Sequence, residues 1–245
     1  MNLQFGYSTG IAYDQDISLS ELLDRFIEMR LNSVELMIAN EKELDQISLD
    51  DISKIKKSFE HISVHGLIKG ITYSEHADAV LDRLTAIMAE VNAAYVVVHP
   101  DLIDDIDWLY AKLGSKLAIE NMDNRKDFGQ CVADLKSLFA SASDARWICD
   151  LNHVYTVDLS MKLAKSLHTE FGDRLVGYHV SGYEGGDRLH VGLKTCHMPF
   201  LLESVENLEV PIIHEGFEKD AEFLVDELSF VNKTISQIRH VECIT

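Results

Sequence analysis

The feature that most constrains this chain is a regular alternation of short apolar runs with longer segments of helical periodicity. Eight apolar or β-branched runs recur at intervals of roughly 30 residues, as buried strands do in βα units. The runs cover residues 3–9, 33–38, 61–66, 95–100, 116–122, 146–151, 174–181 and 210–216. Strands that alternate with helices predict a parallel sheet whose connections are helical crossovers.

The segments between these runs carry the helical signals. Residues 18–30, 74–91 and 156–171 have apolar side chains at helical spacing. Ser18 and Glu21 are spaced as a capping box, in which each side chain satisfies a free backbone N–H at the start of a helix. We therefore expect helices in these three segments.

The number of units selects the architecture. Eight βα units in 245 residues match an α/β fold that is a single (β/α)8 TIM barrel, with one domain over residues 1–245. An open doubly wound sheet is the alternative, and it would usually place a glycine-rich phosphate turn after the first strand. The segment YSTGIAYD (7–14) matches neither GxGxxG nor GxxxxGKS, which favours the barrel.

The charge and hydrophobicity of the sequence limit the kinds of partner that this protein could bind. The formal net charge is −19, whereas a protein that binds nucleic acid needs Lys and Arg to displace phosphate counterions, so nucleic acid is an unfavoured partner. The dense basic cluster Lys54, Lys56 and Lys57 is expected on a solvated helix face. No apolar run approaches the roughly 18 residues of a membrane span, and the N-terminus does not resemble a signal peptide. The four widely spaced cysteines are expected to be reduced thiols of a cytoplasmic protein.

Polar side chains close six consecutive predicted strands, the third to the eighth. They are His65, His99, Glu120, Asp150 with His153 nearby, His179 and Glu215. In TIM-barrel enzymes the carboxyl ends of the strands carry the active site. Lone histidines are often hydrogen-bonded spacers, and an Asp in a βα loop often caps the next helix, which would suit Asp150. As a ring, however, these side chains predict a shared site.

The composition of the ring predicts a metal. Converging carboxylates without Lys or Arg repel one another in a mouth of low dielectric constant, and a divalent cation removes that repulsion. Mixed carboxylate and imidazole ligands suit Zn, Mn, Fe or Co better than Ca. We expect a divalent transition metal, with Zn or Mn preferred.

The same segments resemble those of the xylose isomerase-like TIM barrels, a superfamily that includes sugar and sugar-phosphate isomerases and epimerases and the endonuclease IV (AP endonuclease family 2) nucleases. The resemblance runs strand by strand through short motifs. They are VHGLIKGI (64–71), VVVHP (96–100), AIEN (118–121), CDLNH (149–153), GYHVSG (177–182), DRLHVG (187–192) and IIHEG (212–216).

This resemblance implies site residues. Glu120, Asp150, His179 and Glu215 match the metal-binding quartet that epimerases and nucleases share. Residues corresponding to those that complete the three-zinc site of endonuclease IV are His65, His99, His153, Asp187 and His190. The site would then hold one to three ions.

Two details of the match affect these assignments. Asp187 and His190 are three residues apart, whereas the nuclease pattern sets the pair two apart. In the epimerases the residue matching His153 binds substrate, and Arg188 is expected to bind substrate as well. Gly182, Gly185 and Gly186 are expected in a mobile loop over the mouth.

The preferred function is a divalent-metal-dependent sugar or sugar-phosphate isomerase or epimerase that works through a metal-stabilised enediolate. Glu120 and Glu215 would exchange the proton. The first alternative is a zinc-dependent phosphodiester hydrolase resembling endonuclease IV, and the second is a metabolite-binding barrel without turnover. The expected partner is a small carbohydrate-like molecule, and a homo-oligomer remains open.

Overall fold

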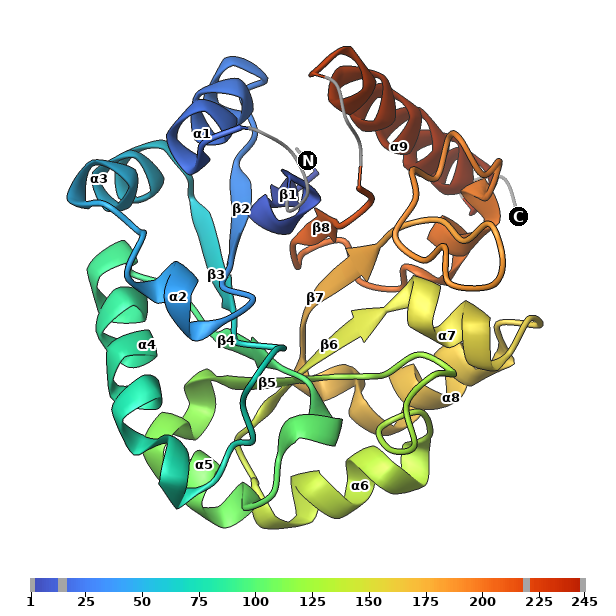
Figure 1. Ribbon diagram of the computed structural model, residues 1–245. Helices are drawn as coiled ribbons and strands as arrows, with labels where there is room; N and C mark the ends of the chain where they lie inside the picture. Colours follow the sequence, from blue (N-terminus) through green and yellow to red (C-terminus); the bar gives the residue numbers. More distant parts are fainter. Residues whose placement is uncertain (1–2, 13–16, 218–220, 243–245) are drawn as a thin grey trace.

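The eight strands form a closed parallel barrel in sequence order, β1 to β8 (Figure 1). The computed structural model describes residues 3–12, 17–217 and 221–242. The strands are β1 (Phe5–Ser8), β2 (Ser33–Met37), β3 (His61–His65), β4 (Val96–Val98), β5 (Leu117–Glu120), β6 (Arg146–Asp150), β7 (Leu175–Val180) and β8 (Ile212–His214). Each falls inside one of the apolar runs, so the predicted single (β/α)8 barrel is confirmed.

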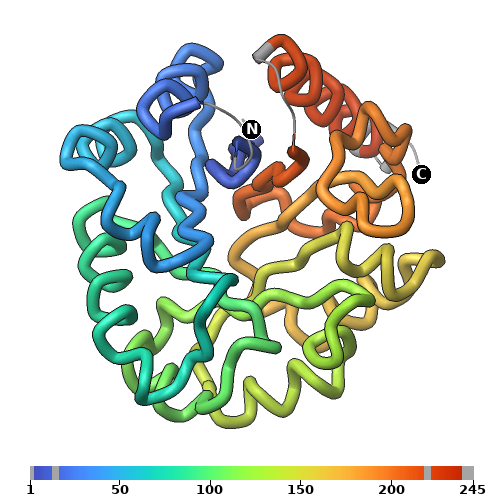
Figure 2. Tube along the Cα trace, in the orientation of Figure 1, coloured from blue at the N-terminus to red at the C-terminus, as the bar shows by residue number. Residues whose placement is uncertain are grey.

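Helices surround the barrel, as the trace in Figure 2 also shows. They are α1 (Leu19–Glu28), α2 (Glu41–Leu44), α3 (Leu49–Ser58), α4 (Asp78–Val91), α5 (Ile106–Leu113), α6 (Val132–Ser141), α7 (Leu151–Val157), α8 (Lys162–Phe171) and α9 (Ala221–Glu242). The connection from β7 to β8 departs from the repeating pattern. Residues 181–211 contain the 3-10 helix Pro199–Ser204 and no α-helix.

Local signals explain where helices begin and end. The predicted capping box is present at the start of α1, where Ser18 accepts from the Glu21 amide and Glu21 accepts from the Ser18 amide. The segment 156–171 was expected to be one helix, and it is interrupted instead between α7 and α8. Asp158 causes the interruption because its carboxylate accepts from the amides of Ser160 and Leu163 and replaces helical hydrogen bonds.

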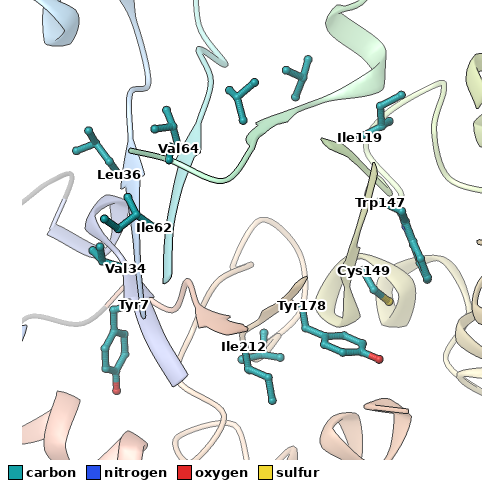
Figure 3. Packing of buried hydrophobic residues seen from close by; sticks show 14 of the residues in the cluster. Tyr7, Val34, Leu36, Ile62, Val64, Ile119, Trp147, Cys149, Tyr178 and Ile212 are labelled. Carbon is teal, nitrogen blue, oxygen red and sulfur yellow. The ribbon is translucent and has the colours of Figure 1, made fainter. Parts of the chain in front are cut away.

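Alternation along the strands separates two layers of side chains. Outward-facing residues such as Val34, Leu36, Ile62 and Val64 belong to the large apolar cluster between the barrel and the helices (Figure 3). Inside the barrel, Tyr95, Val97, Ala118 and Ile148 form a small apolar cluster of their own. Inward positions at the carboxyl ends of β3, β5 and β7 carry the polar side chains of His65, Glu120 and His179.

The lysine cluster, the lengths of the helices and the state of the cysteines can each be compared with the sequence predictions. Lys54 pairs with Asp24 on α1 at 2.6 Å, and Lys56 and Lys57 are exposed on α3, as expected of a solvated helix face. Among the described residues, no helix combines the length and the apolar character that a membrane span requires. Cys131, Cys149 and Cys196 form no disulfide, and Cys243 lies outside the described residues.

Candidate functional site

A cavity of ≈ 320 Å³ opens at the carboxyl ends of the strands. Because side chains alternate between the two faces of a strand, the last inward position of each strand faces this cavity. Predicted site residues that line it are His65, His99, Glu120, His153, His190 and Glu215. Asp150 and His179 lie just beneath them and are fully buried.

Glu120, at the end of β5, is the centre of the arrangement. Its Oε2 atom lies 3.4 Å from His65 Nε2 and 3.2 Å from His99 Nε2. Its Oε1 atom lies 3.0 Å from His179 Nδ1 and 3.4 Å from His153 Nδ1. The two carboxylate oxygens therefore face different pairs of imidazoles.

Four side chains form the predicted metal quartet. Potential ligand atoms of Glu120, Asp150, His179 and Glu215 all lie within 4.8 Å of one another. His179 is at the centre, since its Nδ1 atom is 3.0 Å from Glu120 Oε1 and 3.4 Å from Glu215 Oε1. The spacing suits a single cation with oxygen and nitrogen ligands.

Further groups of the same spacing adjoin the quartet. One consists of His65, His99 and Glu120, and another of Asp150, His153 and His190. Each shares a carboxylate with the quartet. A third combines His65 with His179 and Glu215. The geometry thus offers more than one position for a cation.

Buried polar atoms without partners provide a test of the fit to a metal. Asp150 is fully buried; its Oδ1 accepts from the His153 amide at 2.7 Å, so it does cap α7, while Oδ2 has no hydrogen-bond partner. His99 Nδ1 also lacks one. Unsatisfied buried oxygens are costly, and a coordinated cation would satisfy them. The residues therefore fit a divalent metal.

The carboxyls of the site have separated pKa values. Burial raises the pKa of Asp150 to about 6 and that of Glu215 to about 7. Burial also acts to raise the pKa of Glu120, yet His179, His65 and His99 outweigh it and hold this pKa well below its usual value. Without a cation, Glu120 is the charged carboxylate of the group and Asp150 and Glu215 hold protons more readily.

The imidazoles of the site also differ in the direction in which their pKa values are shifted. Burial acts to lower the pKa of His65, but the hydrogen bond to Glu120 and the nearby carboxylates raise it to about 9. Burial and the neighbouring His153 lower the pKa of His190 to about 3. A metal would have to displace protons from His65, whereas His190 is already a neutral ligand.

The structure does not bring Asp187 and Arg188 to the cavity. Both are exposed in the loop that follows β7; Arg188 pairs with Glu184 at 2.6 Å and its side chain is 71% exposed. A third cation would be held by Asp150 in place of Asp187, together with His153 and His190. The glycines of this loop serve a tight turn, with positive φ angles of 97° at Gly185 and 59° at Gly186.

Several residues of the site were not predicted. Lys69, Asp123, Arg125 and Lys126 line the cavity from the loops after β3 and β5. Loop residues have no fixed periodicity, so the sequence carries no signal for their direction. Glu35 is different, because a carboxylate in the middle of the apolar run SVELMI is a visible anomaly.

Comparison with known proteins supports the fold. No family model matches the sequence, and no curated protein matches it. Among solved structures, 3-keto-D-glucoside 4-epimerase from E. coli is similar, with a TM-score of 0.64, 15% identity, and coverage of 95% of this chain and 100% of that chain.

Two more solved structures are similar to this chain over most of its length. A xylose isomerase domain-containing protein of Salmonella typhimurium has a TM-score of 0.66 and 14% identity, covering 96% of this chain and 99% of that chain. The probable 3-DHS dehydratase of Bacillus anthracis has a TM-score of 0.71 and 10% identity, covering 94% and 99%. These similarities show that the chain shares the (β/α)8 TIM-barrel fold of these proteins.

Proposed function

We propose that this chain is a divalent-metal-dependent isomerase or epimerase of a small carbohydrate or carbohydrate phosphate. The observation that carries the proposal is the quartet of Glu120, Asp150, His179 and Glu215, whose ligand atoms lie within 4.8 Å of one another at a cavity of ≈ 320 Å³. A cavity of this size lies at the small end of the usual range for small-molecule sites, about 300–1,000 Å³. The structural similarity to an epimerase and to a xylose isomerase domain protein supports the proposal.

The residues of the chain would divide the work as follows. Glu120 and Glu215 both line the cavity and both approach His179 Nδ1, at 3.0 and 3.4 Å, so both carboxylates would be close to a substrate bound there. One carboxylate removes a proton from the carbon next to a carbonyl, and the other returns a proton to the neighbouring position or the opposite face. A cation held by the quartet would supply positive charge to two adjacent substrate oxygens and so stabilise the enediolate.

The walls of the cavity fit such a substrate. Lys126 is held by Asp101 at 2.6 Å, and Arg125 is held by Asp123 through contacts of 2.7 and 3.0 Å. These fixed cations would donate to hydroxyl or phosphate oxygens of the substrate. Phe217 offers an apolar surface at the rim for the carbon skeleton.

A specific observation favours a second candidate, a metal-dependent phosphodiester hydrolase. The His65–His99–Glu120 group and the Asp150–His153–His190 group add two possible cation positions to the quartet. Two or three neighbouring cations activate water and stabilise a leaving oxygen in many phosphoesterases. The net charge of −19 weighs against a nucleic-acid substrate and leaves a small phosphodiester as the appropriate probe.

The test is incorporation of solvent deuterium. Metal-loaded protein is incubated in D2O with a panel of aldoses, ketoses and their phosphates, and exchange at the carbon next to the carbonyl is followed by NMR. Bis-p-nitrophenyl phosphate is the parallel probe for hydrolysis. Exchange without hydrolysis supports the isomerase, whereas hydrolysis without exchange on any sugar would overturn it in favour of the second candidate.

Variants assign the roles. Glu120→Gln and Glu215→Gln keep the shape and one oxygen of each side chain but cannot take up a proton, so each should abolish exchange while the fold survives. Asp150→Asn should mainly weaken metal affinity, so excess metal should restore part of the rate. Full exchange in both Gln variants would exclude these carboxylates as the proton-transfer groups.

A further inference from the structure

A charged residue lies inside the barrel below the cavity and has no role in the proposed chemistry. Glu35, in the middle of β2, is 0% exposed and does not line the cavity. Its neighbours along the strand, Val34 and Leu36, face the apolar layer outside the barrel, so Glu35 faces inward. Burial of a carboxylate is expensive unless polar partners compensate for the lost hydration.

The hydrogen-bond contacts of Glu35 connect it to a residue of the metal quartet. Both of its carboxylate oxygens lie 3.2 Å from Nε2 of His179, the imidazole at the centre of the quartet. The other ring nitrogen, Nδ1, faces Glu120 and Glu215. A neutral imidazole that offers Nδ1 to a cation carries its proton on Nε2, and that proton is donated to Glu35.

Glu35 is itself held in position. Ser63 lies opposite Glu35 in the β2–β3 register, and its hydroxyl donates to Glu35 Oε2 at 2.9 Å. The chain of contacts therefore runs from Ser63 through Glu35 to His179 and across the barrel from β3 to β7. Such a carboxylate behind a metal-binding histidine fixes the ring orientation and raises the basicity of the coordinating nitrogen.

A purely structural role does not account for this choice of residue. An apolar side chain of similar volume in place of a buried ionic group is often neutral or stabilising. Val97 and Ile148, at the middle of β4 and β6, show that the interior of the barrel accepts apolar side chains. A carboxylate at position 35 thus points to its contact with His179 rather than to packing.

We propose that Glu35 is a positioning residue that holds the imidazole of His179 with Nδ1 directed at the metal quartet. The inference rests on the proposed metal-dependent function, which it deepens by adding the support for one ligand. Because Glu35 does not reach the cavity, it acts through His179 and not on the substrate.

The test measures metal affinity in three variants. Glu35→Met removes the acceptor and keeps the volume, Glu35→Gln keeps an oxygen that can accept from Nε2–H but loses the charge, and Ser63→Ala removes only the support. Zn²⁺ affinity is measured by competition with a chromogenic chelator. Changes of about 10-fold for Gln and up to about 100-fold for Met are expected, as for other residues behind metal ligands.

Two further measurements separate positioning from general damage. Asp51→Asn is the matched control, because Asp51 is also buried but only caps α3 through Ser48, and it should leave Zn²⁺ affinity unchanged. In Zn²⁺-loaded, ¹⁵N-labelled protein, His179 should show a hydrogen-bonded Nε2–H that is lost in Glu35→Met. If the Met variant does not fold, Glu35→Gln and Ser63→Ala still report on affinity.

Wild-type Zn²⁺ affinity in the Glu35 variants, or equal weakening in Asp51→Asn, would overturn the inference. The measurement of Zn²⁺ affinity does not require turnover, so the two proposals can fail separately. A chain that binds Zn²⁺ in a Glu35-dependent way but exchanges no deuterium would overturn the isomerase proposal while supporting the role of Glu35.

Discussion

Replacement of Asp150 by Asn should make the metal-free protein more stable at neutral pH. Asp150 is 0% exposed, and burial, with the charge of Glu120 adding to it, raises its pKa from 3.8 to about 6. The nearby His153 acts in the opposite direction but does not cancel the effect. The folded chain therefore binds this proton more tightly than the unfolded chain does.

The sign and size of the effect follow from linkage. Stability that depends on a bound proton is fully present below about pH 4 and is lost as the pH rises through about 6. The difference between a pKa of 3.8 and one of about 6 corresponds to about 3 kcal/mol, as an order of magnitude. The variant avoids this cost, and its amide oxygen still accepts from the His153 amide, so the cap of α7 is kept.

The assay is urea unfolding of chelator-treated protein from pH 4 to pH 8. The wild type should lose stability between pH 4 and pH 6 more steeply than the Asp150→Asn variant. Asp123→Asn is the control of opposite sign. Burial acts to raise the pKa of Asp123, but hydrogen bonds from Arg125 lower it to about 2, so this variant should be less stable than the wild type at neutral pH. A variant at Asp150 that is destabilised, or has an unchanged pH dependence, would refute the reasoning.

Three shorter predictions concern the metal, the loop and the partner. Metal affinity should rise with pH between 6 and 9, because ligands must lose protons and the pKa values of His65 and Glu215 are raised to about 9 and about 7; calorimetry in buffers of different ionisation enthalpy should detect the released protons. Glu227→Gln should loosen the loop that carries His190, because buried Glu227 accepts from the Lys194 amide at 2.7 Å; hydrogen exchange should accelerate around that amide. Binding to abasic duplex DNA at physiological salt should be weak, given the net charge of −19, and tight binding in a filter or anisotropy assay would favour the nuclease.

The barrel and the ends of its strands were predictable because period-2 alternation fixes direction. Once β5 and β6 are located, the inward positions Glu120 and Asp150 follow from the pleat alone. The same alternation predicts that Glu35 in β2 faces the interior of the barrel. It was not among the predicted site residues because it lies in the middle of its strand and not at the carboxyl end. Side chains that lie in loops, such as Arg125, have no comparable rule.

The loop after β7 shows why motif matching also has limits. His190 reaches the site with a left-handed backbone, φ 58°, and its Nδ1 contacts Ser181 at 3.2 Å. The neighbouring Arg188 turns outward to Glu184. The direction of a side chain in such a turn depends on backbone angles that spacing alone does not determine.

The interior of the barrel is built in two parts that have opposite effects on stability. Tyr95, Val97, Ala118 and Ile148 form an apolar cluster inside the barrel that stabilises the fold. Near the carboxyl ends, acidic side chains and imidazoles are buried together, and Asp150 Oδ2 has no hydrogen-bond partner. The second part costs free energy in the metal-free protein. A bound cation would reverse that cost, because it binds the folded arrangement and not the dispersed ligands of the unfolded chain. Metal affinity and the free-energy cost of burying these polar groups are therefore two consequences of the same geometry. A substitution that lowers that cost should also weaken metal affinity.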